Sequence, residues 1–271
     1  MIPKIIHYSW ISTDEKPELV RRCMQTWREK LPDYEFVLWD AKKIEEEVKS
    51  NFVEEAIMVK KWAFAADFVR CFAVYKYGGI YLDTDVEVFK SFDDLLDNRM
   101  FIGQEACTYH VNGHVRKATR LTSHCFGAEP MHPYVKLCLY YYKKRRFVRS
   151  MNWRLPDFMR YDQTLLPIIQ SQLLSCYGYK DQACYFNEEQ NLSHGIRVYP
   201  SWYFDAPVMS LSTKNMYCIH HCAGSWFNDE DPLAKDFAMF RRKAVLWKIR
   251  RMINFIPRLL GYEIEVGKVN W

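Results

Sequence analysis

Two aspartates separated by one residue, in the stretch YGGIYLDTDVE, are the residues of this sequence best suited to chemistry. Side chains alternate between the two faces of a strand, so Asp83 and Asp85 are predicted to project to the same side. Paired carboxylates suit a hard divalent cation, and Mg²⁺ or Mn²⁺ held by few protein oxygens completes its shell with water and substrate phosphates. The pattern therefore predicts a Mg²⁺ or Mn²⁺ site that binds a nucleoside diphosphate.

The setting of this pair distinguishes it from a second pair at the same spacing. Asp229 and Asp231 directly precede Pro232, which is typical of the start of a helix. The first pair instead follows a short apolar run, and Gly78 and Gly79 precede that run. We therefore assign the metal site to the first pair.

Two other functions must be weighed against a metal site that binds a nucleoside diphosphate. Haloacid-dehalogenase-like phosphatases also place an aspartate pair after an apolar strand, but their pattern wants Thr or Val two residues after the second aspartate. This sequence has Glu87 there. A non-catalytic carbohydrate-binding or membrane-adaptor domain would leave the charged residues without a task. A metal-dependent phosphatase therefore stays the less favoured alternative.

An acid and a base also lie three residues apart in WAFAADFVRCFAVYKYGG, which predicts a helix from about Val59 to Tyr77, capped by Gly78. Asp67 and Arg70 share one face of it, among small residues. A carboxylate accepts and a guanidinium donates in fixed directions, so this pair could bind sugar hydroxyls. An exposed ion pair, worth about 0.2 to 0.5 kcal/mol, is the other interpretation. The spacing leaves both open.

Two adjacent histidines in MYCIHHC could complete a metal site. A strand over Met216–Cys222 puts His221 on one face and Cys218, His220 and Cys222 on the other, so one histidine is predicted to face the aspartates. The sequence does not decide which. A zinc site from Cys218, His220 and Cys222 is the rival, although it supplies at most three ligands without the usual spacing.

Alternating strands and helices must position these residues. Apolar and alternating runs predict five strands: Lys4–Trp10, Tyr34–Trp39, Ile80–Leu82, Gly195–Tyr199 and Met216–Cys222. The order of strand, helix and strand at the start predicts an α/β fold, in which ligand sites collect at the carboxyl ends of strands.

Helices are predicted over Pro17–Leu31, Pro133–Arg146 and Gln163–Cys176 by their apolar spacing. Ser91 with Asp94 resembles a capping box that begins another helix. The polar, basic stretch Cys107–Arg120 has no strong period, so it is predicted to be a loop.

One further acid stands before the last of these helices, in RYDQTLLP. Asp162 is predicted to be an ordinary helix N-cap. The alternative is that Asp162 or Gln163 lies beneath a bound sugar.

Composition limits the class of protein. The 271 residues are 49% hydrophobic, which is ample for a buried core, and the net charge of +5 is too small to predict a nucleic-acid binder. The nine cysteines are an odd number without C-x-x-C spacing, which favours a reducing compartment. No run approaches the roughly 18 apolar residues of a spanning helix. We expect a cytoplasmic protein.

A family resemblance extends over most of positions 1–228. The segments IPKIIHYSWI, YGGIYLDTDVEVF, IRVYPSWYF and IHHCAGSW, with the Asp67 and Arg70 pair, occur in the same order as in glycosyltransferase family 32. The sequence also resembles, more distantly, the catalytic domain of the clostridial glucosylating toxins. The resemblance implies a GT-A fold with a mixed central sheet flanked by helices over residues 1–234. Residues 235–271 would be a basic helical appendage at the carboxyl terminus.

The resemblance also implies a nucleotide-sugar donor, Mn²⁺ or Mg²⁺, and transfer with retention at the anomeric carbon. The implied catalytic residues are Asp67, Arg70 and Asp85, and the metal ligands are Asp83, Asp85 and His221. Trp10 would stack on the base, and Tyr81 would line the sugar pocket. The implied substrate-binding residues are together Trp10, Asp67, Arg70, Tyr81, Asp83, Ser225 and Trp226.

A UDP-sugar such as UDP-galactose or UDP-glucose is the favoured donor, with a growing, lipid-linked surface or capsular polysaccharide as the acceptor. GDP-mannose is the alternative donor. Front-face attack is favoured over an enzyme nucleophile, because Asp83 and Asp85 are committed to metal and donor.

Two stretches that join cations to large apolar residues, Tyr140–Arg149 and Phe240–Leu260, bear on location. In the second, the apolar side chains fall on one helical face, as in helices that lie in a membrane interface. That stretch could equally pack on its own domain. A peripheral position at the inner face of the cell membrane is the resulting hypothesis.

Overall fold

The computed structural model describes residues 1–111, 114–180, 188–204 and 216–221. Residues 1–106 and 119–223 form one compact unit, and residues 107–118 with 224–271 form a second. The predicted contacts of Ser225 and Trp226, and the predicted appendage over 235–271, lie outside the described residues.

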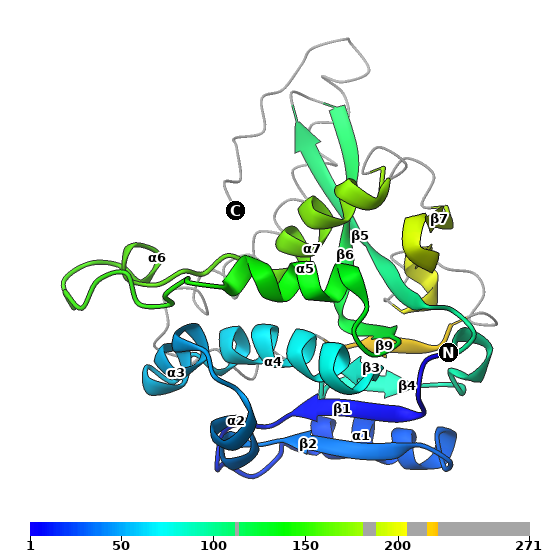
Figure 1. The fold of residues 1–271 in the computed structure, drawn as a ribbon, viewed down its shortest axis with the longest axis horizontal. Helices are drawn as coiled ribbons and strands as arrows, with labels where there is room; N and C mark the ends of the chain where they lie inside the picture. Colours follow the sequence, from blue (N-terminus) through cyan, green and yellow to red (C-terminus); the bar gives the residue numbers. More distant parts are fainter. Residues whose placement is uncertain (112–113, 181–187, 205–215, 222–271) are drawn as a thin grey trace, which may run out of the picture. The chain divides into compact units, whose positions relative to one another are not determined.

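A seven-stranded mixed sheet has the strand order β2-β1-β3-β6-β5-β8-β7 (Figure 1). Strand β1 is parallel to β2 and β3, β3 is antiparallel to β6, and β5 is parallel to β8. A short antiparallel ribbon, β4 with β9, lies beside the sheet. The strands are β1 (Ile5–Ser9), β2 (Glu35–Trp39), β3 (Gly79–Leu82), β4 (Val86–Val88), β5 (Met100–Val111), β6 (His114–Ala128), β7 (Gln190–Leu192), β8 (Ile196–Tyr199) and β9 (Cys218–His220).

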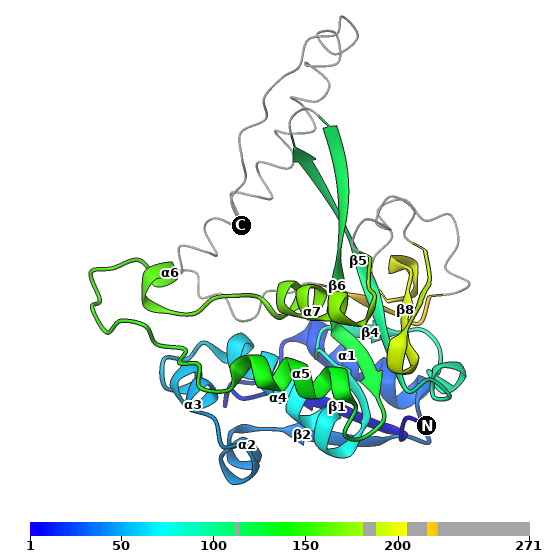
Figure 2. The same cartoon turned by 45° about the horizontal axis from the view of Figure 1, so that its top comes forward.

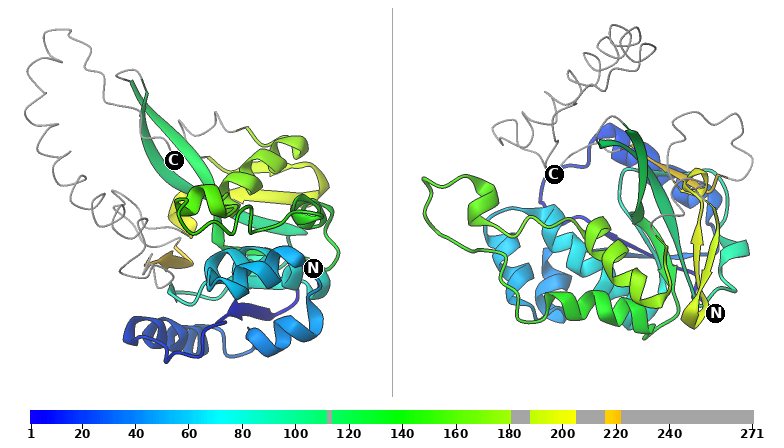
Figure 3. Two further views of the ribbon diagram at one scale, coloured as in Figure 1. Left: turned by 90° about the vertical axis from the view of Figure 1, so that its left-hand side faces the viewer. Right: turned by 90° about the horizontal axis from the view of Figure 1, so that it is seen from above.

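Helices flank this sheet, as the turned views in Figures 2 and 3 show. Helix α4 packs against β1 and β3 together with α3 and α5, and α1 packs against β4. The helices are α1 (Glu18–Lys30), α2 (Ala41–Glu47), α3 (Asn51–Met58), α4 (Trp62–Tyr77), α5 (Pro133–Tyr142), α6 (Asp157–Arg160) and α7 (Leu166–Leu174). The predicted α/β class, with a mixed central sheet flanked by helices, is confirmed.

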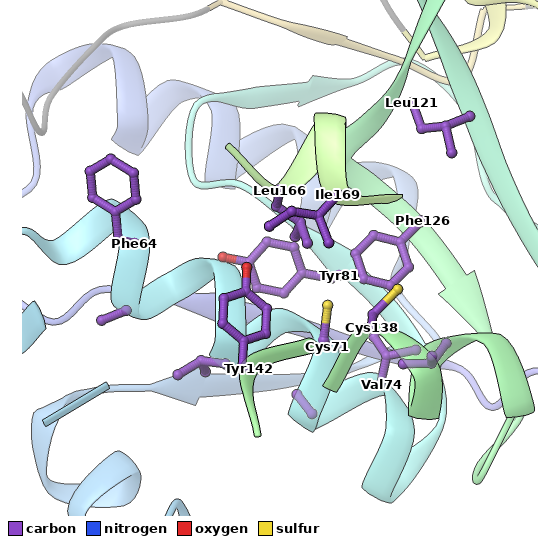
Figure 4. Close-up of a cluster of buried hydrophobic side chains, with 14 of the residues drawn as sticks. Phe64, Cys71, Val74, Tyr81, Leu121, Phe126, Cys138, Tyr142, Leu166 and Ile169 are labelled. Atoms are coloured by element: carbon purple, nitrogen blue, oxygen red, sulfur yellow. The ribbon is translucent and has the colours of Figure 1, made fainter. Parts of the chain in front are cut away.

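The short strand β3 separates two apolar cores. Ile80 and Leu82 pack with α1 and the β4–β9 ribbon, whereas Tyr81 faces the core built by α4, α5 and α7. Figure 4 shows Tyr81 beside Phe126 in that second core. All four residues of β3 are buried, because layers cover both faces of the sheet at this strand. Asp83 therefore directly follows a strand that is buried on both faces.

Two glycines make the passage from α4 to β3. The Gly78 amide closes the helix on the Val74 carbonyl at 2.9 Å, as the predicted cap requires. Gly78 and Gly79 both have positive φ angles, of 67° and 96°. A Cβ on Gly79 would lie 2.6 Å from the Ile5 carbonyl oxygen, so only glycine lets β3 pair so closely with β1.

A buried histidine fastens this passage to the first strand. His7 in β1 bonds the Gly78 carbonyl through Nε2 at 2.9 Å and accepts a hydrogen bond from the Trp39 indole at Nδ1. Burial lowers the pKa of His7 to about 4, so the ring is neutral near pH 7. A neutral ring with its proton on Nε2 satisfies both bonds.

The predicted loop over Cys107–Arg120 is wrong, because most of it belongs to the long strands β5 and β6. Polar and basic residues hide the two-residue period of these strands. Main-chain hydrogen bonds between neighbouring strands do not depend on side-chain polarity, so a strand can form where the pattern is weak.

Two predicted helix starts are also wrong. Helix α4 begins at Trp62 and not near Val59, because Lys60 has a φ of 57°, which separates it from α3. The capping pattern at Ser91 begins only a single 3₁₀ turn over Asp93–Leu95, in which the Ser91 hydroxyl accepts from the Asp93 amide.

Asp162 does not cap a helix, since α7 begins at Leu166 with Leu165 as its N-cap. The buried Asp162 carboxylate instead accepts from the Thr164 hydroxyl at 2.8 Å and pairs with Arg149 and Arg145.

None of the helices in the described part of the chain has the length and apolar character needed to cross a bilayer.

Candidate active site

The two aspartates of the D-x-D motif lie in a tight turn and not in a strand. Strand β3 ends at Leu82, and the Val86 amide donates to the Asp83 carbonyl at 3.0 Å. The predicted strand therefore does not extend through Asp83 and Asp85, and strand alternation does not decide where their side chains point. The two carboxylates have different partners: Arg70 contacts Asp83, and His220 contacts Asp85.

Asp83 belongs to a group of three charged side chains, the Arg70 cluster, in which Asp67 and Arg70 are buried and Asp83 is partly exposed. The Arg70 guanidinium contacts both oxygens of Asp83, at 3.2 and 3.3 Å, and Asp67 at 3.2 Å. It also donates to the carbonyls of Ser123 and Ala66. These five contacts match the five N–H groups of an arginine, so the protein itself satisfies its donors.

Burial sets the electrostatics of this cluster. Burial raises the pKa of Asp67 to about 6, with the neighbouring Asp83 adding to the rise and Arg70 opposing it. Burial would lower the pKa of Arg70, but Asp83, Tyr81 and Asp67 together keep it above its usual value. Two carboxylates share one guanidinium, so the cluster has a net charge of −1 when both are ionised. Asp67 is the member that gains most from a proton.

A helix start adds a donor that the sequence did not reveal. Oδ2 of Asp67 accepts from the Leu166 amide, the first residue of α7, at 3.3 Å. The partial positive charge of a helix amino end favours an anion there. The cluster therefore joins α4, the D-x-D turn and α7, which are 99 residues apart at the extremes.

Asp85 contacts a histidine from strand β9, which is distant in the sequence. Its Oδ1 lies 3.2 Å from Nε2 of His220, which is the last residue of β9. The imidazole of His124 stacks on His220 with ring centres 4.4 Å apart. Burial, followed by the nearby His220, lowers the pKa of His124, and its Nε2 bonds the Phe204 carbonyl. His124 therefore supports His220 as a neutral ring, a role for which the sequence offered no signal.

His221 lies elsewhere, although the resemblance assigned it to the metal site with Asp83 and Asp85. Its Nε2 is 2.8 Å from Glu87, and only its backbone amide reaches Asp85, at the carbonyl. Strand β9 pairs with β4 so that His220 is opposite Val86, which directs the two histidines to different acids. The structure therefore places His220, and not His221, beside the D-x-D carboxylate.

The donor set suits a divalent cation only in part. Asp83, Asp85 and His220 are all partly exposed. Carboxylates suit Mg²⁺ or Mn²⁺, whereas imidazole is more often a ligand of zinc, copper, iron or nickel. Among the described residues, no three Asp, Glu, His or Cys side chains converge as a complete metal site. A cation here would need ligands from its substrate, which is how Mg²⁺ and Mn²⁺ are held with phosphates.

The rival zinc site gains nothing from the geometry. Cys218 is buried, and its thiol contacts the Phe204 carbonyl at 3.8 Å. Cys222 lies outside the described residues.

Trp10 and Tyr81, the aromatic residues predicted to contact the donor, differ in exposure. Trp10 follows β1 and is half-buried, with Lys16 5.2 Å from its ring centre. Because β1 and β3 are parallel with His7 opposite Tyr81, Trp10 leaves the sheet at the same edge as the D-x-D turn. Tyr81 is fully buried beneath Arg70, whose Cζ is 4.7 Å from the ring centre. Tyr81 thus supports the cluster from inside the core.

Comparison with known families and proteins agrees with this geometry. Residues 17–102 match the family described as the glycosyltransferase sugar-binding region containing a DXD motif. That segment contains Asp67, Arg70 and the D-x-D turn. The similarity predicted from the sequence is confirmed over residues 17–102, which match the model of the D-x-D-containing sugar-binding region.

Two fungal proteins illustrate the relationship. Inositol phosphoceramide mannosyltransferase 3 of Schizosaccharomyces pombe is 39% identical over 98 residues, which are 35% of this chain and 27% of that protein. Mannosyl phosphorylinositol ceramide synthase CSH1 of Saccharomyces cerevisiae is 27% identical over 162 residues, which are 58% and 38% of the two chains. The similarity thus spans well under half of these relatives' length. Among solved structures, PaToxG glycosyltransferase is 20% identical with a TM-score of 0.41, over 65% of this chain and 69% of that one.

Proposed function

We propose that this protein is a retaining, metal-dependent glycosyltransferase of the GT-A type that moves a hexose from a nucleotide sugar to a glycan or lipid-linked acceptor. The observation that carries the proposal is the Arg70 cluster, which lies with Asp85 inside the matched sugar-binding region, together with the contact between Asp85 and His220 from β9. A largely buried, prearranged group of charges together with a partly exposed carboxylate is costly to build and suits a binding site.

The proposed roles follow from exposure. Asp85 and His220 would hold Mn²⁺ or Mg²⁺, which would stabilise the negative charge on a departing diphosphate. The open edge of Asp83 would meet the donor ribose and sugar. Asp67 and Arg70 lie behind it, so they fix the direction in which Asp83 accepts hydrogen bonds.

Trp10, which leaves the sheet at the same edge, would stack on the base of the donor. The predicted contacts of Ser225 and Trp226 with the diphosphate belong to the proposal on the resemblance alone. His221 is replaced by His220 as the proposed metal ligand, because its ring contacts Glu87.

Two donors compete. A UDP-hexose is the donor favoured by the sequence, with a capsular or surface polysaccharide as acceptor. GDP-mannose is the second candidate, because the similar fungal proteins are named as mannosyltransferases. Those names also favour a lipid-borne acceptor and hence work at a membrane surface.

The test is the thermal midpoint of the purified protein with UDP, GDP or CMP, each with and without Mn²⁺. A ligand that binds only the native state raises the midpoint by mass action. We expect a rise with one nucleotide that needs Mn²⁺ and is lost in Asp85→Asn. A folded protein whose midpoint moves with none of the three would contradict the proposal, and a rise with GDP alone would replace the UDP donor by GDP-mannose.

A further inference from the structure

A loop between α5 and α7 presents an apolar surface that its own unit does not cover. We call residues 143–160 the basic-aromatic loop; it ends with the single turn of α6. Figures 1 and 2 and the right panel of Figure 3 all place it away from the sheet and the other helices of its unit. Nothing in the proposed reaction uses this loop.

The base of the loop is firmly built. Phe147 is fully buried and stacks on Tyr161, with ring centres 5.4 Å apart and planes 5° from parallel. The Glu55 carboxylate from α3 accepts from the Val148 amide at 3.0 Å and pairs with Arg146. The Arg149 amide donates to the Arg160 carbonyl at 2.7 Å, which closes the two limbs on each other. The fold therefore holds the tip out, and its exposure is not the fraying of a loose segment.

The tip gathers large apolar side chains in water. Ten such residues are exposed in the described part of the chain, and four of them lie within residues 151–159. Their exposed fractions are 69% for Met151, 76% for Trp153, 67% for Phe158 and 50% for Met159. Scattered exposed apolar residues are normal, but a concentration of this kind marks an interaction surface.

Basic residues outnumber acidic ones in this loop. The loop contains seven basic residues and one acid, Asp157. Asp157 is paired with Lys61 and Arg160, and Arg154 lies 5.5 Å from the ring centre of Trp153. The basic residues are Lys143, Lys144, Arg145, Arg146, Arg149, Arg154 and Arg160. Even with Glu55 and Asp162 at the base, positive charge is in excess.

We propose that the basic-aromatic loop inserts its tip into an anionic phospholipid surface. Trp and Phe partition into the boundary between headgroups and acyl chains, while long Lys and Arg side chains reach lipid phosphates. Attraction of a basic segment to anionic lipid and burial of apolar area act together in such peripheral contacts. Binding to a groove of a partner protein usually uses a regular apolar face of a helix or strand. Here the apolar side chains come from an irregular loop and a single helical turn, which favours lipid.

The loop leads directly back to the candidate site. Its return limb passes through Tyr161 and Asp162 to Leu166, whose amide binds Asp67. With the proposed function, a membrane-bound acceptor would meet the enzyme on this side. The binding itself does not depend on that function, so the two proposals can fail separately.

The experiment is co-sedimentation of the full chain with phosphatidylcholine vesicles, with and without phosphatidylglycerol. Trp153→Ser with Phe158→Ser removes the apolar tip, and Met131→Ser with Trp202→Ser removes two exposed apolar side chains outside the loop. Every variant keeps residues 235–271, so any binding by that segment is common to all. Both pairs are exposed, and equal thermal midpoints would verify folding.

We expect binding to the anionic vesicles that falls about tenfold or more in the tip variant and is unchanged in the control. Lys143→Glu with Lys144→Glu should weaken binding to anionic vesicles as well. Equal binding of the tip variant and the unaltered chain would overturn the proposal, as would no preference for phosphatidylglycerol. Because aromatic and basic groups also bind single-stranded nucleic acid, tip-dependent binding to an oligonucleotide without vesicle binding would overturn it too.

Discussion

The Arg70 cluster and the Asp85–His220 pair each contain one aspartate of the D-x-D turn, but their surroundings differ. Arg70 is fully enclosed, and three carboxylate oxygens and two carbonyls occupy its donors. Asp85 and His220 keep part of their surface in water, and Oδ1 of Asp85 lies 3.2 Å from Nε2 of His220. The Arg70 guanidinium is enclosed by protein groups, whereas the Asp85–His220 pair is partly exposed.

We therefore expect the partners of Asp83 to matter mainly for the stability of the fold. The partners of Asp85, two residues further on, should matter mainly for ligand binding. Breaking a buried ion group leaves an uncompensated charge in the interior, which costs much stability. Partly exposed groups remain solvated when a partner is removed, so their loss costs little stability and shows in ligand binding. Substitutions in the two regions should therefore fail in different assays.

The largest expected effect is on folding. Arg70→Met would leave Asp67 and Asp83 facing each other without their cation, and we expect the free energy of unfolding to fall by about 3 to 5 kcal/mol. Urea unfolding at pH 7 measures this. Arg21→Met, which removes an exposed arginine beside Glu18, is the matched control and should cost less than about 0.5 kcal/mol. Similar losses in the two variants would remove the distinction drawn above.

The next effect is on metal-dependent binding. Asp85→Asn and His220→Gln should each abolish the Mn²⁺-dependent rise in thermal midpoint with the donor nucleotide. Turnover, measured as sugar transfer, should fall about a hundredfold or more, since charge stabilisation at the leaving group is lost. The midpoint without ligand should change little. Full retention of the Mn²⁺ effect in both variants would place the metal elsewhere.

A third prediction concerns pH. The raised pKa of Asp67, about 6 against a usual 3.8, means that the folded state favours the protonated acid. The stability gained from this proton is fully present below pH 3.8 and is lost as pH rises through 6. Asp67→Asn imitates the neutral acid at every pH. The stability of Asp67→Asn relative to the unaltered protein should therefore increase by about 2 kcal/mol from pH 4 to pH 7. Urea midpoints across that range measure it, and a flat difference would show that Asp67 titrates normally.

The smallest effect is expected at the neighbouring exposed pair. His221→Gln and Glu87→Gln should change unfolding free energy by less than about 1 kcal/mol, because both side chains are about 31% exposed. The Mn²⁺-dependent rise should persist in both variants. Its loss in His221→Gln but not in His220→Gln would restore His221 as the ligand and reverse the assignment made from the geometry.

Local patterns predicted β1, α1, β2, α4 and β3, but not α2, α3 or β4. Apolar spacing identified β1, α1, β2 and β3 to within one or two residues, since each element buries a face that its own sequence defines. Gly78 marked the end of α4 because its backbone conformation suits glycine. The hairpin of β5 and β6 was missed, since pairing between strands supplies hydrogen bonds that a polar sequence does not advertise.

The site shows the same division. The three-residue spacing placed Asp67 and Arg70 on one helical face, and the structure confirms that contact. The bidentate contact of Arg70 with Asp83, the Leu166 amide at Asp67 and the stacking of His124 on His220 join segments 13 to 99 residues apart. Spacing in one segment states which face a side chain occupies and not which distant group will meet it.

The sequence by itself determined which residues can do chemistry here: the D-x-D carboxylates after a buried strand, the acid and base on the preceding helix, and two histidines near the end. Those follow from local periodicity and backbone preference. Only the tertiary structure decided that Asp83 is neutralised by Arg70, and that His220 and not His221 meets Asp85. The register between β4 and β9 sets the second contact, and a shift of one residue would exchange the two histidines.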